Sequence, residues 1–224
     1  MLTHLQQLDL LRGPKSRLKT DAAFARRVTA VKRWQNARLA KWYADLSADP
    51  RYAPAVAFFL DELYGTKDSA LRDRDLIRME PTMRRLLPDF AFQTVESALE
   101  LDLISEEFDQ ALAAKMDTEQ IDGTSYASAF RAAGGKDRRL KQVELMRRVG
   151  EGLNAVVAKP LIYSTLKMLR GPARLAGLGE MQRFLEAGFT AFRHMDDAAY
   201  FLETIATRES ALIESLFAGQ SVNF

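Results

Sequence analysis

The chain has 224 residues, of which 47% are hydrophobic and 28% charged, a composition typical of a globular protein with a sizeable buried core. It contains no cysteine, which excludes disulfides, iron–sulfur clusters, thiolate zinc sites and cysteine nucleophiles. The net charge is +2, but residues 1–51 and 131–224 have an excess of basic side chains, and residues 52–130 an excess of acidic ones. This polarity fits self-association or a nucleic-acid surface, and more simply a fold that interleaves the charges.

The lack of cysteine also suits a reducing compartment. The first residues show neither the basic start nor the apolar stretch of a signal peptide, and no uncharged apolar run approaches the ~20 residues that a membrane span needs. We therefore expect a cytoplasmic protein without a membrane partner.

The first long element is a basic amphipathic helix. Thr20 and Asp21 offer a side-chain cap for its first turn. Apolar residues then recur every three or four positions, which predicts a helix from Asp21 to Leu46 with a stripe of Phe24, Val28, Val31, Leu39 and Trp42.

The densest apolar run of the sequence follows at residues 54–64. Pro54 suits a first helical turn, and Gly65 suits the position just after a helix. Helical spacing places Val56, Phe59, Leu60 and Leu63 on one face, and the neighbouring residues widen that face. A helix that is apolar around most of its circumference is normally buried, so we predict that this one forms the centre of the fold.

This run also carries a resemblance. Residues Phe58-Phe59-Leu60-Asp61-Glu62-Leu63-Tyr64 are similar to the signature of an uncharacterised bacterial family named after its FFLEELY motif, with Asp61 in place of the first Glu. The runs Arg72–Leu76 and Pro172–Gly179 resemble that family too. The resemblance implies a helical bacterial protein and brings no chemistry with it.

Downstream, two helices are expected between residues 90 and 116. The first has Phe90, Val95 and Leu99 on its apolar side. Ser105 is interpreted as the cap of the second, because Glu106 and Glu107 follow where carboxylates favour a helix start.

The last third of the chain predicts further helices. Pro160 begins one whose inward side holds Leu161, Ile162, Leu166 and Leu169. The final helix shows a second long apolar stripe, Leu202, Ile205, Leu212 and Leu216. Gly134-Gly135 is the one plausible subdomain joint.

No segment alternates in the manner of a strand. The sequence therefore predicts an all-α fold, a multi-helix bundle of roughly nine to eleven helices around the central apolar helix at about residues 54–64, with no sheet. We expect residues 1–224 to form a single helical domain, with the possible joint near residues 134–135.

The strongest polar group is an arginine-rich helix. Arg72, Arg74 and Arg78, with Tyr64 nearby, are candidate ligand-binding residues, because converging guanidinium groups suit phosphate or carboxylate ligands. The simpler interpretation is a solvated helix with internal ion pairs. Asp61 and Glu62 interrupt the apolar helix shortly before, and we expect at least one of them to form a structural ion pair with these arginines.

Other chemistry finds little support. His194 lies between aromatic and acidic residues, but His4 is the one other histidine, so a multi-histidine metal site cannot be built. No catalytic residue, metal site or cofactor is predicted. Nucleic acid is not an expected partner, because Trp34 and Trp42 lack the spacing of a base-stacking platform.

Two functions stay open. The first is a non-enzymatic, self-associating interaction or scaffolding module, expected to be a homodimer built on the stripe of residues 21–46 or on that of the final helix. The second is a helical bundle that binds an apolar or anionic small molecule between helices, with a ligand that the sequence leaves unknown.

Overall fold

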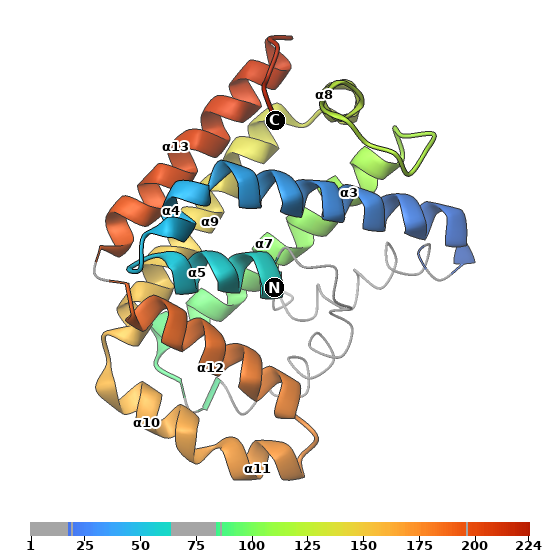
Figure 1. Ribbon diagram of the computed structural model, residues 1–224. Coiled ribbons are helices and arrows are strands. Elements are labelled where there is room, and N and C mark those ends of the chain that lie inside the picture. Colours follow the sequence, from blue (N-terminus) through green and yellow to red (C-terminus); the bar gives the residue numbers. More distant parts are fainter. Residues whose placement is uncertain (1–17, 19, 64–83, 86, 196) are drawn as a thin grey trace.

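The computed structural model describes residues 18, 20–63, 84–85, 87–195 and 197–224. Within this part of the chain there are ten α-helices and no strand, and 81% of the described residues are helical, which confirms the all-α bundle (Figure 1). The elements are α3 (Ala22–Trp42), α4 (Ala44–Ala48), α5 (Ala53–Phe58) with the π-helix η1 (Phe59–Leu63), α7 (Asp89–Ala113), α8 (Gly123–Ala133), α9 (Lys136–Val157), α10 (Pro160–Met168), α11 (Arg170–Leu175), α12 (Gly179–Arg193) and α13 (Ala198–Phe217).

Helix α3 begins where the sequence predicts. The carboxylate of Asp21 accepts a hydrogen bond from the backbone N–H of Phe24 at 2.8 Å and so caps the first turn. The predicted helix to Leu46 is interrupted at Tyr43, after which the short helix α4 continues.

Helix α7 differs from the sequence-based expectation. It runs unbroken through Ser105, whose hydroxyl donates to the carbonyl of Leu101 at 2.7 Å instead of capping a new helix. Glu106 and Glu107 reach cations on other helices: Glu106 binds Lys32 of α3, and Glu107 binds Arg138 of α9. The acidic pair therefore serves packing between helices and not a helix start.

The apolar run at residues 54–64 begins as α5 and continues as η1. Phe58 is buried, and the ring of Phe59 packs against Phe192 and Phe201 at centroid distances of 6.0 and 5.9 Å. The described interior, however, is divided into three clusters, and this helix contributes to the second of them.

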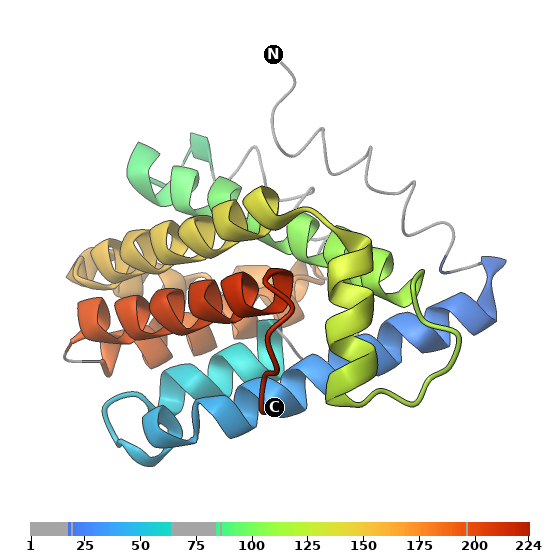
Figure 2. The ribbon, with the colours of Figure 1, turned by 90° about the horizontal axis from the view of Figure 1, so that it is seen from above.

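Helix α9 holds the layers together. It lies between α7 on one side and α13 on the other (Figure 2). Glycines permit this close approach: a Cβ at Gly150 would overlap Leu202 of α13, and one at Gly152 would lie 2.9 Å from Cγ2 of Thr94 on α7.

The two apolar stripes pack against each other within one chain. Phe24, Val28 and Val31 of α3 share the first cluster with Leu212 and Leu216 of α13, and Leu39 shares the second with Leu202. The surfaces on which the homodimer prediction rests are thus covered in the monomer. Tyr126 and Phe130 of α8 and Val143 of α9 also share the first cluster, so packing is continuous across Gly134-Gly135; the domain count stays a prediction.

Helices α10 and α11 lie at the lower edge in Figure 1, where both contact α12 and where α10 also contacts α9. The expectation for this segment is partly wrong. Ile162, Leu166 and Leu169 are half-buried, but Leu161 is 81% exposed. Neighbouring helices cover just one side of α10, so an apolar residue on its other side faces solvent.

Candidate functional site

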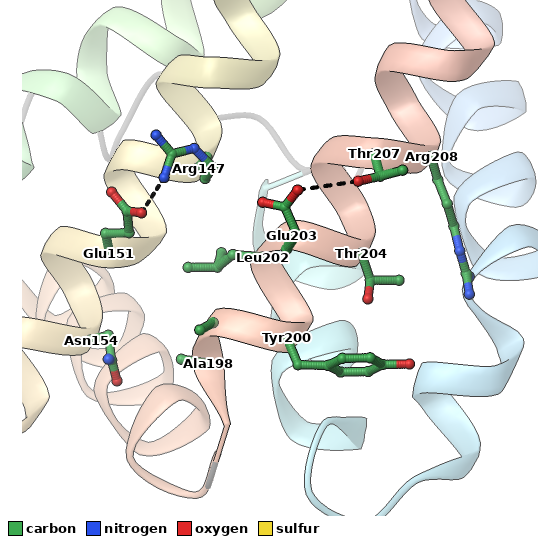
Figure 3. A pocket seen from close by; sticks show the side chains of 11 residues that line it. Arg147, Glu151, Asn154, Ala198, Tyr200, Leu202, Glu203, Thr204, Thr207 and Arg208 are labelled. Carbon is green, nitrogen blue, oxygen red and sulfur yellow. Dashed lines mark hydrogen bonds and ion pairs between the residues drawn. The ribbon is translucent and has the colours of Figure 1, made fainter.

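A groove runs between α9 and α13 (Figure 3). Its volume is about 690 Å³, within the range of small-molecule sites. Leu202 points from α13 toward α9 and, with Ala198, supplies apolar surface. The lining residues are Arg147, Glu151, Asn154, Ala198, Ala199, Tyr200, Leu202, Glu203, Thr204, Thr207 and Arg208.

The charges around this groove neutralise one another. Arg147 donates through Nη2 to Glu144 at 2.7 Å and also binds Glu151. Its guanidinium holds the pKa of Glu144 below the ordinary value. Arg208 donates to Asp45 of α4 at 2.9 and 2.6 Å, which lowers the pKa of that carboxyl.

Other polar residues lie between these ion pairs. Glu203 accepts from Thr207 at 3.4 Å, and the lining residues include no histidine, cysteine or lysine. Tyr200 is 53% exposed and stacks on the buried ring of Tyr52 at 5.9 Å. A ligand here would find an aromatic ring and apolar surface, but it would have to compete with ion pairs for any charged contact.

A second polar cluster lies between α3 and α7. Gln35 donates to the carboxylate of Asp109 at 2.6 Å, and Lys32 binds the neighbouring Glu106 at 2.5 Å. Burial raises the pKa of Asp109 to about 6, against the opposing effects of Lys32 and of the hydrogen bond from Gln35. Because these groups satisfy one another across a helix interface, we interpret the cluster as structural.

The surface of α10 and α11 is of a different kind. Three large apolar side chains project from it: Leu161 is 81% exposed, Met168 80% and Leu175 93%. Between Glu151 and Glu180 the sequence has no acidic residue and four basic ones, Lys159, Lys167, Arg170 and Arg174. We call residues 159–177 the α10–α11 arm.

Most residues singled out from the sequence fall outside the described part of the chain, namely Tyr64, Arg72, Arg74 and Arg78. The predicted pairing of Asp61 or Glu62 with these arginines therefore stays a prediction. Asp61 is exposed, and Glu62 accepts from Nη1 of Arg183 on α12 at 2.9 Å. The sequence does not indicate Arg183 as the partner of Glu62, because the two residues are 121 positions apart and local spacing carries no signal over that distance.

His194 is exposed at the end of α12. Among the described residues, no group of three or more His, Cys, Asp or Glu side chains is arranged to hold a metal ion. In that same part of the chain, every helix is too short or too polar to cross a bilayer.

A family model described as "Domain of unknown function (DUF8198)" matches residues 15–223. The chain belongs to this family. The DUF8198 model carries no statement about the FFLEELY motif, so that resemblance stays a proposal. Neither a search of curated proteins nor one of solved structures found a match.

Proposed function

We propose that this DUF8198 protein is a non-enzymatic interaction module and that the α10–α11 arm is its binding surface. The observation that carries the proposal is the exposure of Leu161, Met168 and Leu175. Large apolar side chains that are exposed to water within one short segment can mark a binding surface. The bacterial origin, the FFLEELY relationship and the cytoplasmic location are parts of the same proposal, and they rest on the sequence alone.

Folding does not explain why these side chains are apolar. Helix α10 has no buried residue, and α11 has just Ala173. Polar residues at positions 161, 168 and 175 would cost the fold little, so a binding role accounts for them better.

A photo-reactive amino acid in place of Met168 tests the proposal in the cells from which the protein comes. Irradiation should link this position to another molecule of the cell. The same group at Lys115, an exposed residue in the turn after α7, is the control and should give no adduct. Equal yields at both positions, or adducts at Lys115 alone, would remove the proposal.

Self-association is a finer part of the proposal and needs its own test. Since the α3 and α13 stripes pack on each other, a homodimer must use another surface. Sedimentation of the purified protein over micromolar concentrations measures this directly. A mass near 25.2 kDa at every concentration would refute the homodimer but leave the interaction module standing.

The second candidate function is small-molecule binding in the α9–α13 groove. The exposed ring of Tyr200 beside apolar Leu202 favours it. A ligand that copurifies with the protein and is lost in Tyr200→Ser would support this function. If the purified protein carries no ligand and the Tyr200 variant behaves as the wild type, the groove has no such role.

A further inference from the structure

We propose that the α10–α11 arm binds an anionic lipid surface, with Leu161, Met168 and Leu175 entering the headgroup layer and basic residues contacting lipid phosphates. This inference rests on the proposed function and names the partner of that surface. It departs from the sequence-based expectation of no membrane partner, which considered membrane-spanning segments alone. A peripheral contact needs no such segment.

One face of α10 carries Leu161, Ser164, Thr165 and Met168, which are exposed and uncharged. The other exposed residues of this helix are Pro160 and Lys167. The hydroxyl of Thr165 donates to the carbonyl of Leu161 at 2.9 Å, and that of Ser164 to the carbonyl of Pro160 at 3.4 Å. Because these donors already have acceptors within the helix, moving this face out of water leaves few unmade hydrogen bonds.

Cations flank this uncharged face. Arg170 is engaged by the carboxylate of Glu186, and the ammonium of Lys167 lies 4.3 Å from the ring centroid of Tyr163. Lys159 and Arg174, at the two ends of the arm, form no ion pair with any residue that the structure describes. Apolar side chains bordered by lysine and arginine complement a layer of anionic headgroups above acyl chains.

The place of the arm in the fold suits a flat partner. Helices α10 and α11 run along the same edge of the molecule, so both can meet one surface (Figure 1). The three apolar side chains project outward, and neither groove described along α13 includes them. A folded partner would need a matching pocket for each side chain, whereas a lipid layer adapts to them.

A second copy of the chain is a poorer occupant. A two-fold interface presents the same patch from both subunits. Since the arm holds four cations and no anion, such an interface would bring like charges together in a partly dehydrated contact. Anionic lipid headgroups, in contrast, attract these four cations.

Cosedimentation with vesicles tests the inference on the full purified chain. We expect binding to vesicles of phosphatidylcholine mixed with phosphatidylglycerol, much weaker binding to pure phosphatidylcholine, and loss of binding at high salt. Replacing Leu161, Met168 and Leu175 together by serine should lower the partition coefficient at least ~10-fold, since their apolar contacts are lost.

Two controls keep the result interpretable. Phe90→Ser removes an exposed apolar ring outside the arm and outside the α9–α13 groove, and should bind vesicles as the wild type does. Lys159→Gln with Arg174→Gln leaves the apolar face intact and should reduce both the binding and its dependence on salt. This double variant still tests the inference if the triple serine variant fails to fold, which far-UV circular dichroism would reveal.

Vesicle binding that is absent, or equal for the wild type and the arm variants, overturns the lipid inference. The crosslinking experiment then separates the two proposals. Adducts at Met168 with a protein would leave the interaction module standing and assign the arm to an acidic protein partner. No adduct and no vesicle binding would remove both proposals.

Discussion

Arg38 of α3 and Glu209 of α13 form a buried bidentate ion pair. The guanidinium donates through Nη1 to Oε1 at 2.8 Å and through Nη2 to Oε2 at 3.0 Å, and the two side chains are 6% and 17% exposed. Burial alone would lower the pKa of Arg38, but the Glu209 carboxylate outweighs it and the pKa is raised. The Tyr43 hydroxyl adds a third hydrogen bond to Glu209 at 2.8 Å. The pair therefore ties together two helices 171 residues apart in sequence.

Removing one partner of this pair should be far more harmful than removing both. Arg38→Met or Glu209→Leu alone should lower the free energy of unfolding by ~3–5 kcal/mol, because each leaves a buried charge without its partner. The double variant should recover a large part of that loss. Urea denaturation of the four proteins measures the coupling. Losses that simply add would show that the pair is not coupled.

Asp109 should make stability depend on pH. Its pKa in the folded protein is raised to about 6, above the ordinary value near 3.8, so the folded state holds the proton more tightly than the unfolded state. Stability from this group is therefore fully present below about pH 4 and is lost as the pH rises toward 6.

Asp109→Asn should remove this dependence. Relative to the wild type, the variant should gain ~1–3 kcal/mol of unfolding free energy between pH 4 and pH 7. The other titrating groups are the same in both proteins, so their contributions to the pH dependence largely cancel. Gln35 can still donate to the amide oxygen of asparagine. If the difference in unfolding free energy between the variant and the wild type stays the same from pH 4 to pH 7, the pKa of Asp109 is not raised.

The sequence predicted what local patterns determine. The side-chain cap at Asp21 and the apolar stripes of α3 and α13 follow from residue type and spacing, and the structure confirms them. Contacts between distant segments carry no such signal. Ser105 followed by two glutamates has the pattern of a helix start, yet the cations that bind those glutamates lie on α3 and α9, so α7 continues.

The sequence could not predict the exposed apolar surface of α10 and α11, for a related reason. Residues 160–169 are apolar around most of the helix, so periodicity cannot say which side meets the core. The position of α10 at the edge of the bundle decides that Ile162 turns inward and Leu161 outward. That position depends on α12, a helix that follows later in the chain.

The close packing of α9 predicts a contrast between two glycine substitutions. Gly150→Ala should gain up to ~1 kcal/mol from helix propensity but lose ~1–3 kcal/mol because the new methyl overlaps Leu202, for a net destabilisation. Gly171→Ala in α11 is the control, since no atom of another described residue lies within 4 Å of its Cβ position. It should leave the unfolding midpoint unchanged or slightly higher. Equal effects of the two substitutions would mean that α9 and α13 are less tightly packed.

Arg139 carries the last prediction. Its guanidinium lies 4.1 Å from the ring centroid of Phe108 and 3.8 Å from that of Phe130, and the residue is 4% exposed. Nε donates to the carbonyl of Gly134 at 3.3 Å, but the buried Nη2 has no hydrogen-bond partner among the residues that the structure describes. Desolvation lowers the pKa of Arg139 to about 10. Its role in the fold is thus chiefly to fill space between two aromatic rings.

Arg139→Met should therefore be neutral or stabilising, because it keeps an unbranched chain between the rings and removes a poorly solvated charge. Arg139→Ala removes the same charge but leaves a cavity, and should destabilise the protein by ~2–4 kcal/mol. Denaturant titrations of the two variants separate the effect of removing the charge from the effect of leaving a cavity. If methionine is as harmful as alanine, the cation itself stabilises the fold through the two rings, and cation–π attraction outweighs the cost of burial.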